Sequence, residues 1–187
     1  MKFRFDIDKS IASTAYLIRK QRGALNVLPL VKALYHANRA SLVRYGRSIT
    51  GDRLISMKSG PNVSETYDLI NGTPHAKPEH LVKWQKYIAR KHNTMQLIPD
   101  ANPNIDCLSG REMRLLDDAL AVVCAVKGRI DEWSHRYFPE WEKPTGLSQS
   151  TTIDPKRILE IEQKTPEEIE DIEGEIESVN WLRSIAG

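Results

Sequence analysis

Cysteine and long apolar runs are both scarce in this chain of 187 residues. Cys107 and Cys124 lie seventeen positions apart, which matches no zinc-binding spacing. Cys124 falls in an apolar run, so we expect a buried thiol there. That run, residues 119–126, is the longest and has eight residues, whereas a helix needs about 20 to span a bilayer. The N-terminus lacks the apolar core of a signal peptide. We therefore expect a cytoplasmic protein without a membrane span.

Familiar catalytic motifs are absent as well. The sequence contains no HExxH, GxGxxG, Walker or GxSxG pattern. Its five histidines show no metal-ligand spacing. His135 is expected to be a hydrogen-bonded structural residue, with a metal or acid–base role as the alternative. Asp117 and Asp118 diverge by about 100° on a helix and cannot serve one site, so we expect Asp117 to form a cap or to pair with an arginine. We expect no enzyme activity, no cofactor and no metal.

What remains is the composition of an ordinary globular domain. Hydrophobic residues make up 40% of the chain and charged residues 28%, as is typical of water-soluble proteins. Apolar periodicity and capping signals predict helices that begin near residues 8, 29, 64, 78, 109, 130, 154 and 165. The first is expected to be capped by Asp8 or Ser10. Ser109 and Glu112 form a capping box that opens the expected central core helix, which we expect to end at Gly128.

Residues 44–70 carry the most specific pattern in the chain. They contain RYGRSITGD, then MKSGP, then SETYDLI. Gly46 is expected to close a helix, and the Thr-Gly-Asp turn at residues 50–52 predicts a tight hairpin over residues 48–54. A strand is expected over residues 53–58 and is ended by Gly60-Pro61, with residues 95–98 as a further strand beside the hairpin. Ser64 is expected to cap the next short helix.

The order of these motifs resembles the signature of the Panacea domain, the SocA-like family of bacterial antitoxins. Leu108-Ser109 resembles the start of a later helix of that domain, and His135, Pro139 and Trp141 resemble its end. The resemblance covers about residues 8–142. We expect an α+β fold, mainly helical, with a small antiparallel β-sheet built on a hairpin near residues 48–58 and a C-terminal helical extension.

The resemblance implies an antitoxin that neutralises a cognate protein toxin by direct protein–protein binding. Arginine and aromatic residues are favoured anchors of such interfaces, so we expect Arg44, Tyr45, Arg47 and Tyr67 to bind the partner. Other motif residues are expected to be structural: Gly46, Gly51, Asp52, Gly60, Pro61, His135 and Trp141. No motif specifies which toxin is bound or what oligomeric state the protein adopts.

The C-terminal part differs in composition from the rest. Residues 144–152 are rich in Ser, Thr and Gly. This composition predicts a linker that follows a domain of residues 1–143. The linker and a C-terminal helical extension together make up residues 144–187. The last helix carries an apolar stripe of Ile169, Ile172, Ile176 and Val179 opposite an acidic face. The stripe packs against either its own domain or a partner, and we expect partner binding.

Charge is distributed unevenly along the chain. Residues 1–60 hold twelve Lys and Arg against three Asp, and residues 160–177 hold nine Asp and Glu against one Lys. Such separation indicates an interaction tail or faces with different partners. An alternative function is therefore a nucleic-acid-binding regulator, although no nucleic-acid-binding motif favours it. Basic residues of the first half would contact the phosphates, namely Arg19, Lys20, Arg22, Arg39, Arg44, Arg47 and Arg53. A further alternative is a prophage or mobile-element protein that uses the same fold for host interaction.

Overall fold

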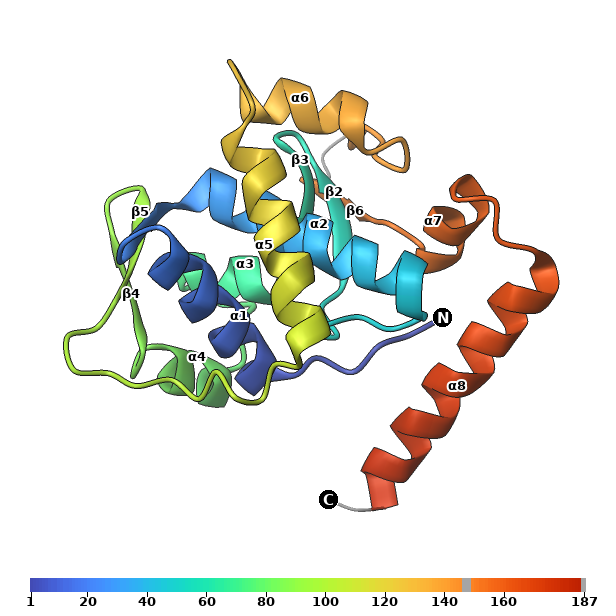
Figure 1. Ribbon diagram of the computed structural model, residues 1–187, viewed down its shortest axis with the longest axis horizontal. Coiled ribbons are helices and arrows are strands. Elements are labelled where there is room, and N and C mark those ends of the chain that lie inside the picture. Colours follow the sequence, from blue (N-terminus) through green and yellow to red (C-terminus); the bar gives the residue numbers. More distant parts are fainter. Residues whose placement is uncertain (146–148, 186–187) are drawn as a thin grey trace.

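A computed structural model describes residues 1–145 and 149–185, which form eight helices and six strands (Figure 1). In chain order these elements are α1 (Ile7–Lys20), β1 (Ala24–Asn26), α2 (Val27–Tyr45), β2 (Leu54–Met57), β3 (Gly60–Val63), α3 (Ser64–Asn71), α4 (Pro78–Trp84), β4 (Ile88–Lys91), β5 (Thr94–Leu97), α5 (Gly110–Cys124), α6 (Ile130–Tyr137), β6 (Ser150–Thr152), α7 (Pro155–Ile161) and α8 (Pro166–Ile185). The predicted fold class, mainly helical α+β with a C-terminal helical extension, is confirmed. No helix in the described part of the chain combines the length and the apolar character needed to cross a membrane.

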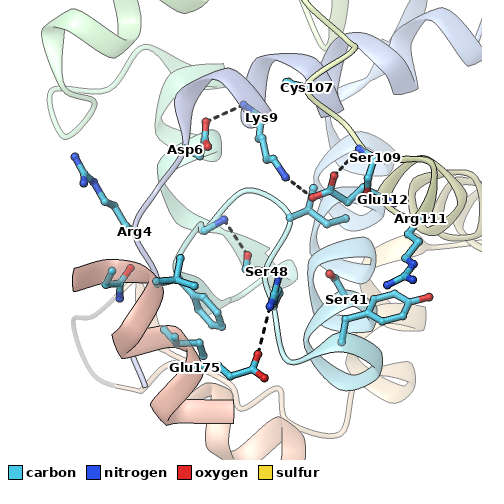
Figure 2. A pocket seen from close by; sticks show the side chains of 18 residues that line it. Arg4, Asp6, Lys9, Ser41, Ser48, Cys107, Ser109, Arg111, Glu112 and Glu175 are labelled. Atoms are coloured by element: carbon cyan, nitrogen blue, oxygen red, sulfur yellow. Dashed lines mark hydrogen bonds and ion pairs between the residues drawn. The ribbon is translucent and has the colours of Figure 1, made fainter. Parts of the chain in front are cut away.

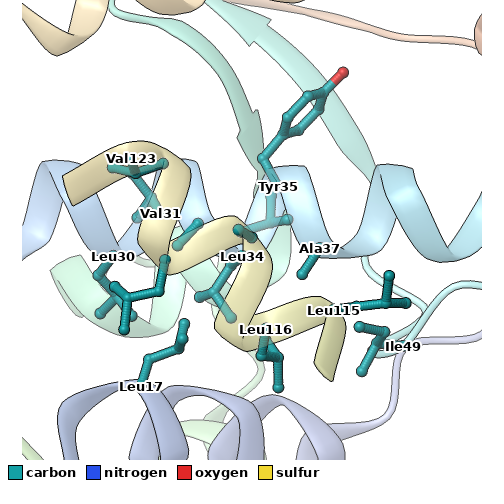
Figure 3. Close-up of a cluster of buried hydrophobic side chains, with 14 of the residues drawn as sticks. Leu17, Leu30, Val31, Leu34, Tyr35, Ala37, Ile49, Leu115, Leu116 and Val123 are labelled. Atoms are coloured by element: carbon teal, nitrogen blue, oxygen red, sulfur yellow. The ribbon is translucent and has the colours of Figure 1, made fainter. Parts of the chain in front are cut away.

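The core forms where α5 crosses α2, with α1 packed beside them (Figure 3). Leu30 and Leu34 of α2, Leu116 of α5 and Leu17 of α1 are almost completely buried. Burial of one such side chain contributes about 1.5–3 kcal/mol, so this contact accounts for much of the hydrophobic stabilisation. It also fixes the C-terminal end of α2 beside the N-terminal end of α5, where the candidate site lies.

The helix boundaries confirm the local signals in part. The predicted capping box is present, because the Ser109 N–H donates to Glu112 over 2.7 Å and the Glu112 N–H donates to Ser109 Oγ over 3.3 Å. The helix ends at Cys124 rather than at Gly128, and Cys124 is exposed rather than buried as predicted. The predicted caps of α1 were wrong: Asp6 accepts from the Lys9 N–H over 3.1 Å.

The hairpin lies further along the chain than predicted. Its strands are β2 and β3, which pair antiparallel from Leu54 with Val63 to Met57 with Gly60. The turn therefore falls at Lys58 and Ser59, and residues 48–53 form a loop without strand pairing. Gly60 and Pro61 belong to β3 instead of ending the strand. Pro61 is tolerated because β3 is an edge strand of the β3-β2-β6 sheet.

A second sheet, with strand order β1-β5-β4, lies on the far side of α1 from α5. The predicted strand near residues 95–98 exists as β5, but it pairs with β1 and β4 and not with the hairpin. The helix predicted near residue 78 is α4, and after it the buried Ile88 begins β4.

The C-terminal segment returns to the domain in three steps. β6, the last three residues of the predicted linker, pairs with β2 through Ile55 and Thr152, while residues 146–148 of that linker lie outside the described part. α7 then packs against α2 and buries Ile158 and Leu159. α8 follows and runs along one edge of the molecule, and its C-terminal end stands away from the other elements (Figure 1).

Candidate functional site

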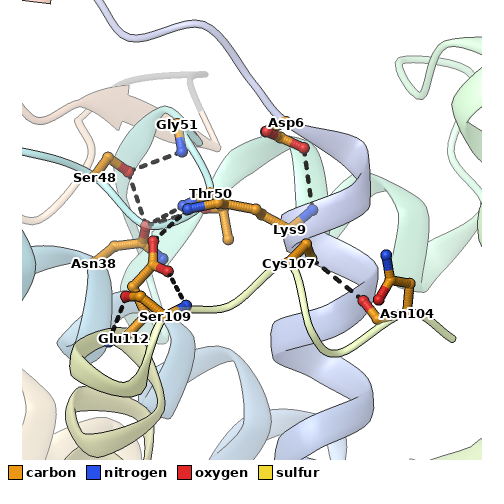
Figure 4. Close-up of polar contacts among 10 residues, drawn as sticks. All are labelled: Asp6, Lys9, Asn38, Ser48, Thr50, Gly51, Asn104, Cys107, Ser109 and Glu112. Atoms are coloured by element: carbon orange, nitrogen blue, oxygen red, sulfur yellow. Dashed lines mark hydrogen bonds and ion pairs between the residues drawn. The ribbon is translucent and has the colours of Figure 1, made fainter.

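The loop between α2 and β2 is anchored by one buried side-chain amide, that of Asn38. Asn38 Oδ1 accepts three hydrogen bonds, from Ser48 Oγ over 2.8 Å and from the Thr50 N–H and Oγ1 over 3.0 Å each (Figure 4). The amide nitrogen donates to the Leu34 carbonyl over 2.9 Å, so this buried polar group is satisfied on both sides. Gly46 closes α2 in the left-handed conformation, as predicted. The loop is thus a fixed part of the surface.

Asp52 caps α3 from outside that helix. Its carboxylate is 1% exposed and accepts from the Glu65 N–H over 2.8 Å and the Thr66 N–H over 2.9 Å. The Glu65 side chain in turn accepts from the backbone N–H of Arg53, the residue after Asp52, over 2.9 Å. Burial and the nearby Glu65 carboxylate raise the pKa of Asp52. The predicted cap, Ser64, is instead the first helical residue, and the residue before it makes no side-chain cap bond.

Gly51 lets the N-terminal segment run directly over this loop. Its φ is 64°, and a Cβ atom there would lie 2.0 Å from the Arg4 carbonyl oxygen. The Asp6 N–H donates to the Thr50 carbonyl over 2.8 Å and fixes the crossing. Only glycine permits this approach.

The structure brings the hairpin together with α6 through Gly60 and Pro61. A Cβ at residue 60 would lie 2.1 Å from Ser134 Oγ. The Pro61 carbonyl accepts from Lys32 Nζ over 2.6 Å, and the Lys32 side chain comes from α2 and is fully buried. Burial lowers the pKa of Lys32 to about 7, and the carboxylate of Asp131 opposes this shift.

His135 and Trp141 complete the same cluster. Their rings stack at 3.7 Å with an interplanar angle of 9°, and Trp141 Nε1 donates to the Met57 carbonyl over 2.9 Å. Burial lowers the pKa of His135, which favours the neutral imidazole. In the described part of the chain no three His, Cys, Asp or Glu residues are placed to hold a metal.

A buried ion-pair network joins α2 to the C-terminal extension. Glu140 is 2% exposed and accepts from Tyr35 over 2.6 Å and from Arg39 over 2.7 Å. Arg39 also donates to Glu162, beyond α7, over 2.7 Å. The extension is therefore tied to the domain by this network as well as by the buried side chains of α7.

A pocket of about 380 Å³ lies between the domain and α8 (Figure 2). Its walls are the N-terminal segment, the end of α2, the loop after it, the start of α5 and one face of α8. Four cationic side chains line it, namely Arg4, Lys9, Arg47 and Arg111. Three acidic ones also line it, namely Asp6, Glu112 and Glu175. Apolar and aromatic surface comes from Phe3, Tyr45, Ile49, Ile176 and Val179.

Four of the predicted partner-binding residues meet in this pocket. Tyr45 and Arg47 come from α2 and the loop after it, and Ile176 and Val179 come from α8. Arg44, next to Tyr45, lies 4.0 Å from Asp118 and is exposed.

The other three predicted residues lie elsewhere. Tyr67 does not line the pocket and packs partly buried against the core from α3. Ile169 is buried in the core, and Ile172 packs beneath the end of α2, where it is the nearest side chain to Gly46. Ile169 and Ile176 are only 8% and 6% exposed, so in this arrangement their side chains are covered by their own domain.

Two of the pocket cations, Lys9 and Arg47, are paired with carboxylates. Lys9 lies 2.5 Å from Glu112, and Arg47 lies 3.4 Å from Glu175. Arg111 stacks over the Tyr45 ring at 5.5 Å, and no carboxylate pairs with it within residues 1–145 and 149–185. The pocket therefore presents a cation beside an aromatic ring, a combination suited to a carboxylate-bearing partner.

Three anchoring residues were not predicted from the sequence. Asn38, Lys32 and Glu140 were not singled out, although a polar residue on the apolar face of a predicted helix marks the first two. Asp117 was expected to form a cap or to pair with an arginine, and it accepts instead from Tyr16 over 2.9 Å and Lys20 over 3.0 Å.

Comparison with known families identifies the class of protein. The chain belongs to the antitoxin SocA-like, Panacea domain family, whose model matches residues 30–142. The matched region extends from α2 to the Trp141 cluster and leaves out α1, α7 and α8. No match to this chain was found among curated proteins or among solved structures.

Proposed function

We propose that this protein is an antitoxin that binds a cognate protein toxin directly and blocks it without catalysis. Family membership over residues 30–142 is the observation that supports this role. The family region contributes Tyr45, Arg47 and Arg111 to the pocket, which are residue types favoured at the centre of protein interfaces. We therefore place the toxin-binding surface at the end of α2 and the start of α5.

The distribution of ion pairs favours a protein partner over nucleic acid. Among the basic residues of the first half, Lys20, Arg39 and Arg47 are paired with Asp117, Glu140 and Glu175. Such pairing reduces the positive charge that these three side chains offer to phosphates, whose neutralisation dominates nucleic-acid binding. Salt-sensitive DNA binding by the purified protein at low micromolar concentration would support the regulator alternative.

Co-expression tests the proposed function. The neighbouring gene is induced alone and together with this protein, and growth and co-purification are measured. We expect toxicity that this protein suppresses, together with a stable complex. Growth arrest that persists in the presence of this protein would contradict the proposal.

Two arginines provide a matched pair for locating the surface. Arg47 and Arg129 have side chains 68% and 69% exposed, and each pairs with carboxylates. Arg47→Ala is expected to weaken complex formation about tenfold or more, and Arg129→Ala on the opposite part of the molecule is expected to leave it unchanged. Equal effects of the two substitutions would place the interface elsewhere.

A further inference from the structure

The second half of α8, residues 175–185, lies over a basic and apolar surface of its own domain. Glu175 faces Arg47, Ile176 is buried, and Asn180 donates to the Lys2 carbonyl over 2.9 Å. α8 thus places a carboxylate and two apolar side chains, those of Glu175, Ile176 and Val179, on the surface to which we assign toxin binding. Its position shows what kind of segment that surface accepts.

This half of α8 fits the domain incompletely. An open pocket of about 380 Å³ separates part of its inner face from the domain. The apolar stripe continues past the edge of the domain, so Val179 is 37% exposed and Leu182 is 53% exposed. The ion pair that holds Glu175 joins two side chains more than 60% exposed, and such pairs contribute little.

The first half of α8 is held more firmly. Ile169 belongs to the core, Ile172 packs beneath Gly46, and Glu173 lies 2.6 Å from Lys156 of α7. Gly174 separates the two halves. A Cβ atom at Gly174 would meet nothing within 4 Å, so packing does not require a glycine there, and glycine weakens a helix interior relative to alanine.

We infer that residues 175–185 form a displaceable strap, and that the surface beneath it receives a helix of the toxin that presents a carboxylate and apolar side chains on one face. This inference rests on the proposed function and specifies the chemistry of the partner segment. The arriving helix presents a carboxylate to Arg47 and Arg111 and apolar side chains to Tyr45 and to the pocket. The strap occupies the surface until that helix replaces it.

A labelled synthetic peptide of residues 166–185 is the probe, because it has the chemistry that the surface accepts. Its binding to the full-length protein is measured by fluorescence anisotropy. Glu175→Arg in the protein repels the strap from Arg47 and is expected to tighten peptide binding about two- to fivefold. Glu177→Arg, the same charge change at an exposed residue outside the pocket, is the matched control and is expected to have no effect.

Charge reversal on the domain tests the contact itself. Arg47→Glu weakens the contact of the strap and of the unmodified peptide alike, so a peptide carrying Glu175→Arg is expected to bind the Arg47→Glu protein about two- to fivefold more tightly than the unmodified peptide does. Gly174→Ala in the protein stiffens α8 and is expected to weaken peptide binding by up to about fivefold. Hydrogen exchange of the unmodified chain should be faster in residues 175–185 than in residues 166–173.

Three results would overturn the inference. The first is equal peptide binding, or none, across all variants. The second is exchange in residues 175–185 as slow as in residues 166–173. The third is self-association of the chain that Glu175→Arg strengthens, as seen by sedimentation, because the occupant would then be a second copy.

The neutralisation assay separates this inference from the proposed function. If Glu175→Arg weakens toxin neutralisation, α8 itself contacts a basic toxin and the strap inference is wrong. If the neighbouring toxin is not neutralised at all while the peptide results hold, the proposed function is wrong and the surface chemistry stands.

Discussion

Replacement of Gly51 by alanine should reveal how tightly the N-terminal segment is bound to the loop after α2. Gly51 and Gly72 have nearly the same left-handed backbone, with φ of 64° and 61°. A Cβ at Gly51 would lie 2.0 Å from the Arg4 carbonyl oxygen, whereas a Cβ at Gly72 would meet nothing within 4 Å. Gly72→Ala therefore isolates the conformational cost, and Gly51→Ala adds the steric one.

The two costs differ in size. The left-handed conformation costs alanine about 1 kcal/mol relative to glycine at either position. At Gly51 the backbone of residues 3–6 must also move, which breaks the 2.8 Å hydrogen bond from Asp6 to Thr50. Losing that buried bond costs about 1–2 kcal/mol more. We expect Gly51→Ala to destabilise the fold by about 2–3 kcal/mol and Gly72→Ala by about 1 kcal/mol.

Urea denaturation followed by circular dichroism measures both free energies of unfolding, and thermal melts provide a second measure. For a chain of this size 1 kcal/mol corresponds to about 2–4 °C, so the melting temperature of Gly51→Ala should fall by about 4–12 °C. Equal destabilisation by the two substitutions would show that the N-terminal segment does not press on the loop, and the reasoning would then fail.

Three further predictions concern the buried lysine, the extension and metal content. The pKa of Lys32 is lowered from 10.5 to about 7 in the folded protein. Between these two pH values the unfolded chain keeps a proton on Lys32 that the folded protein has released. This lysine therefore makes the free energy of unfolding rise with pH over that range. Lys32→Met should remove at most about 3 kcal/mol of the increase between pH 7 and pH 9, and an unchanged pH profile in urea titrations would contradict the prediction. Ile158→Ala, at a fully buried site of α7, should lower the free energy of unfolding by about 2–4 kcal/mol. Ile185 is 64% exposed, so Ile185→Ala should change that free energy by less than about 0.5 kcal/mol. Similar free-energy changes for the two substitutions would show that α7 is not part of the core. The purified protein should contain no stoichiometric metal, and tightly held zinc found by elemental analysis would refute this expectation.

The elements that the sequence predicted well are those whose signals are local. The capping box of α5 joins Ser109 to Glu112 within one helical turn, and Gly46 closes α2 because its own backbone conformation requires it. The antitoxin family was also visible in the order of short motifs, which requires no knowledge of their contacts. These features depend on residues a few positions apart, so the residues that cause them can be identified from the sequence alone.

The failures involve partners distant in the chain. The hairpin was placed too early because Thr50, Gly51 and Asp52 have turn-forming composition, yet their role is to receive the N-terminal segment and to cap α3. β5 was assigned to the wrong sheet because strand propensity does not specify which edge a strand joins. Cys124 was expected to be buried because its neighbours are apolar, although the last turn of α5 exposes it.

The sequence by itself determined the helical elements, the fold class and the family, because periodicity, capping and motif order act over short separations. Only the tertiary structure decided which of the predicted interface residues share a surface. Arg47 and Glu175 are separated by 128 positions, and their pairing depends on how α7 and α8 return along α2. Such contacts are set by packing and charge complementarity across the whole domain, which no local pattern encodes.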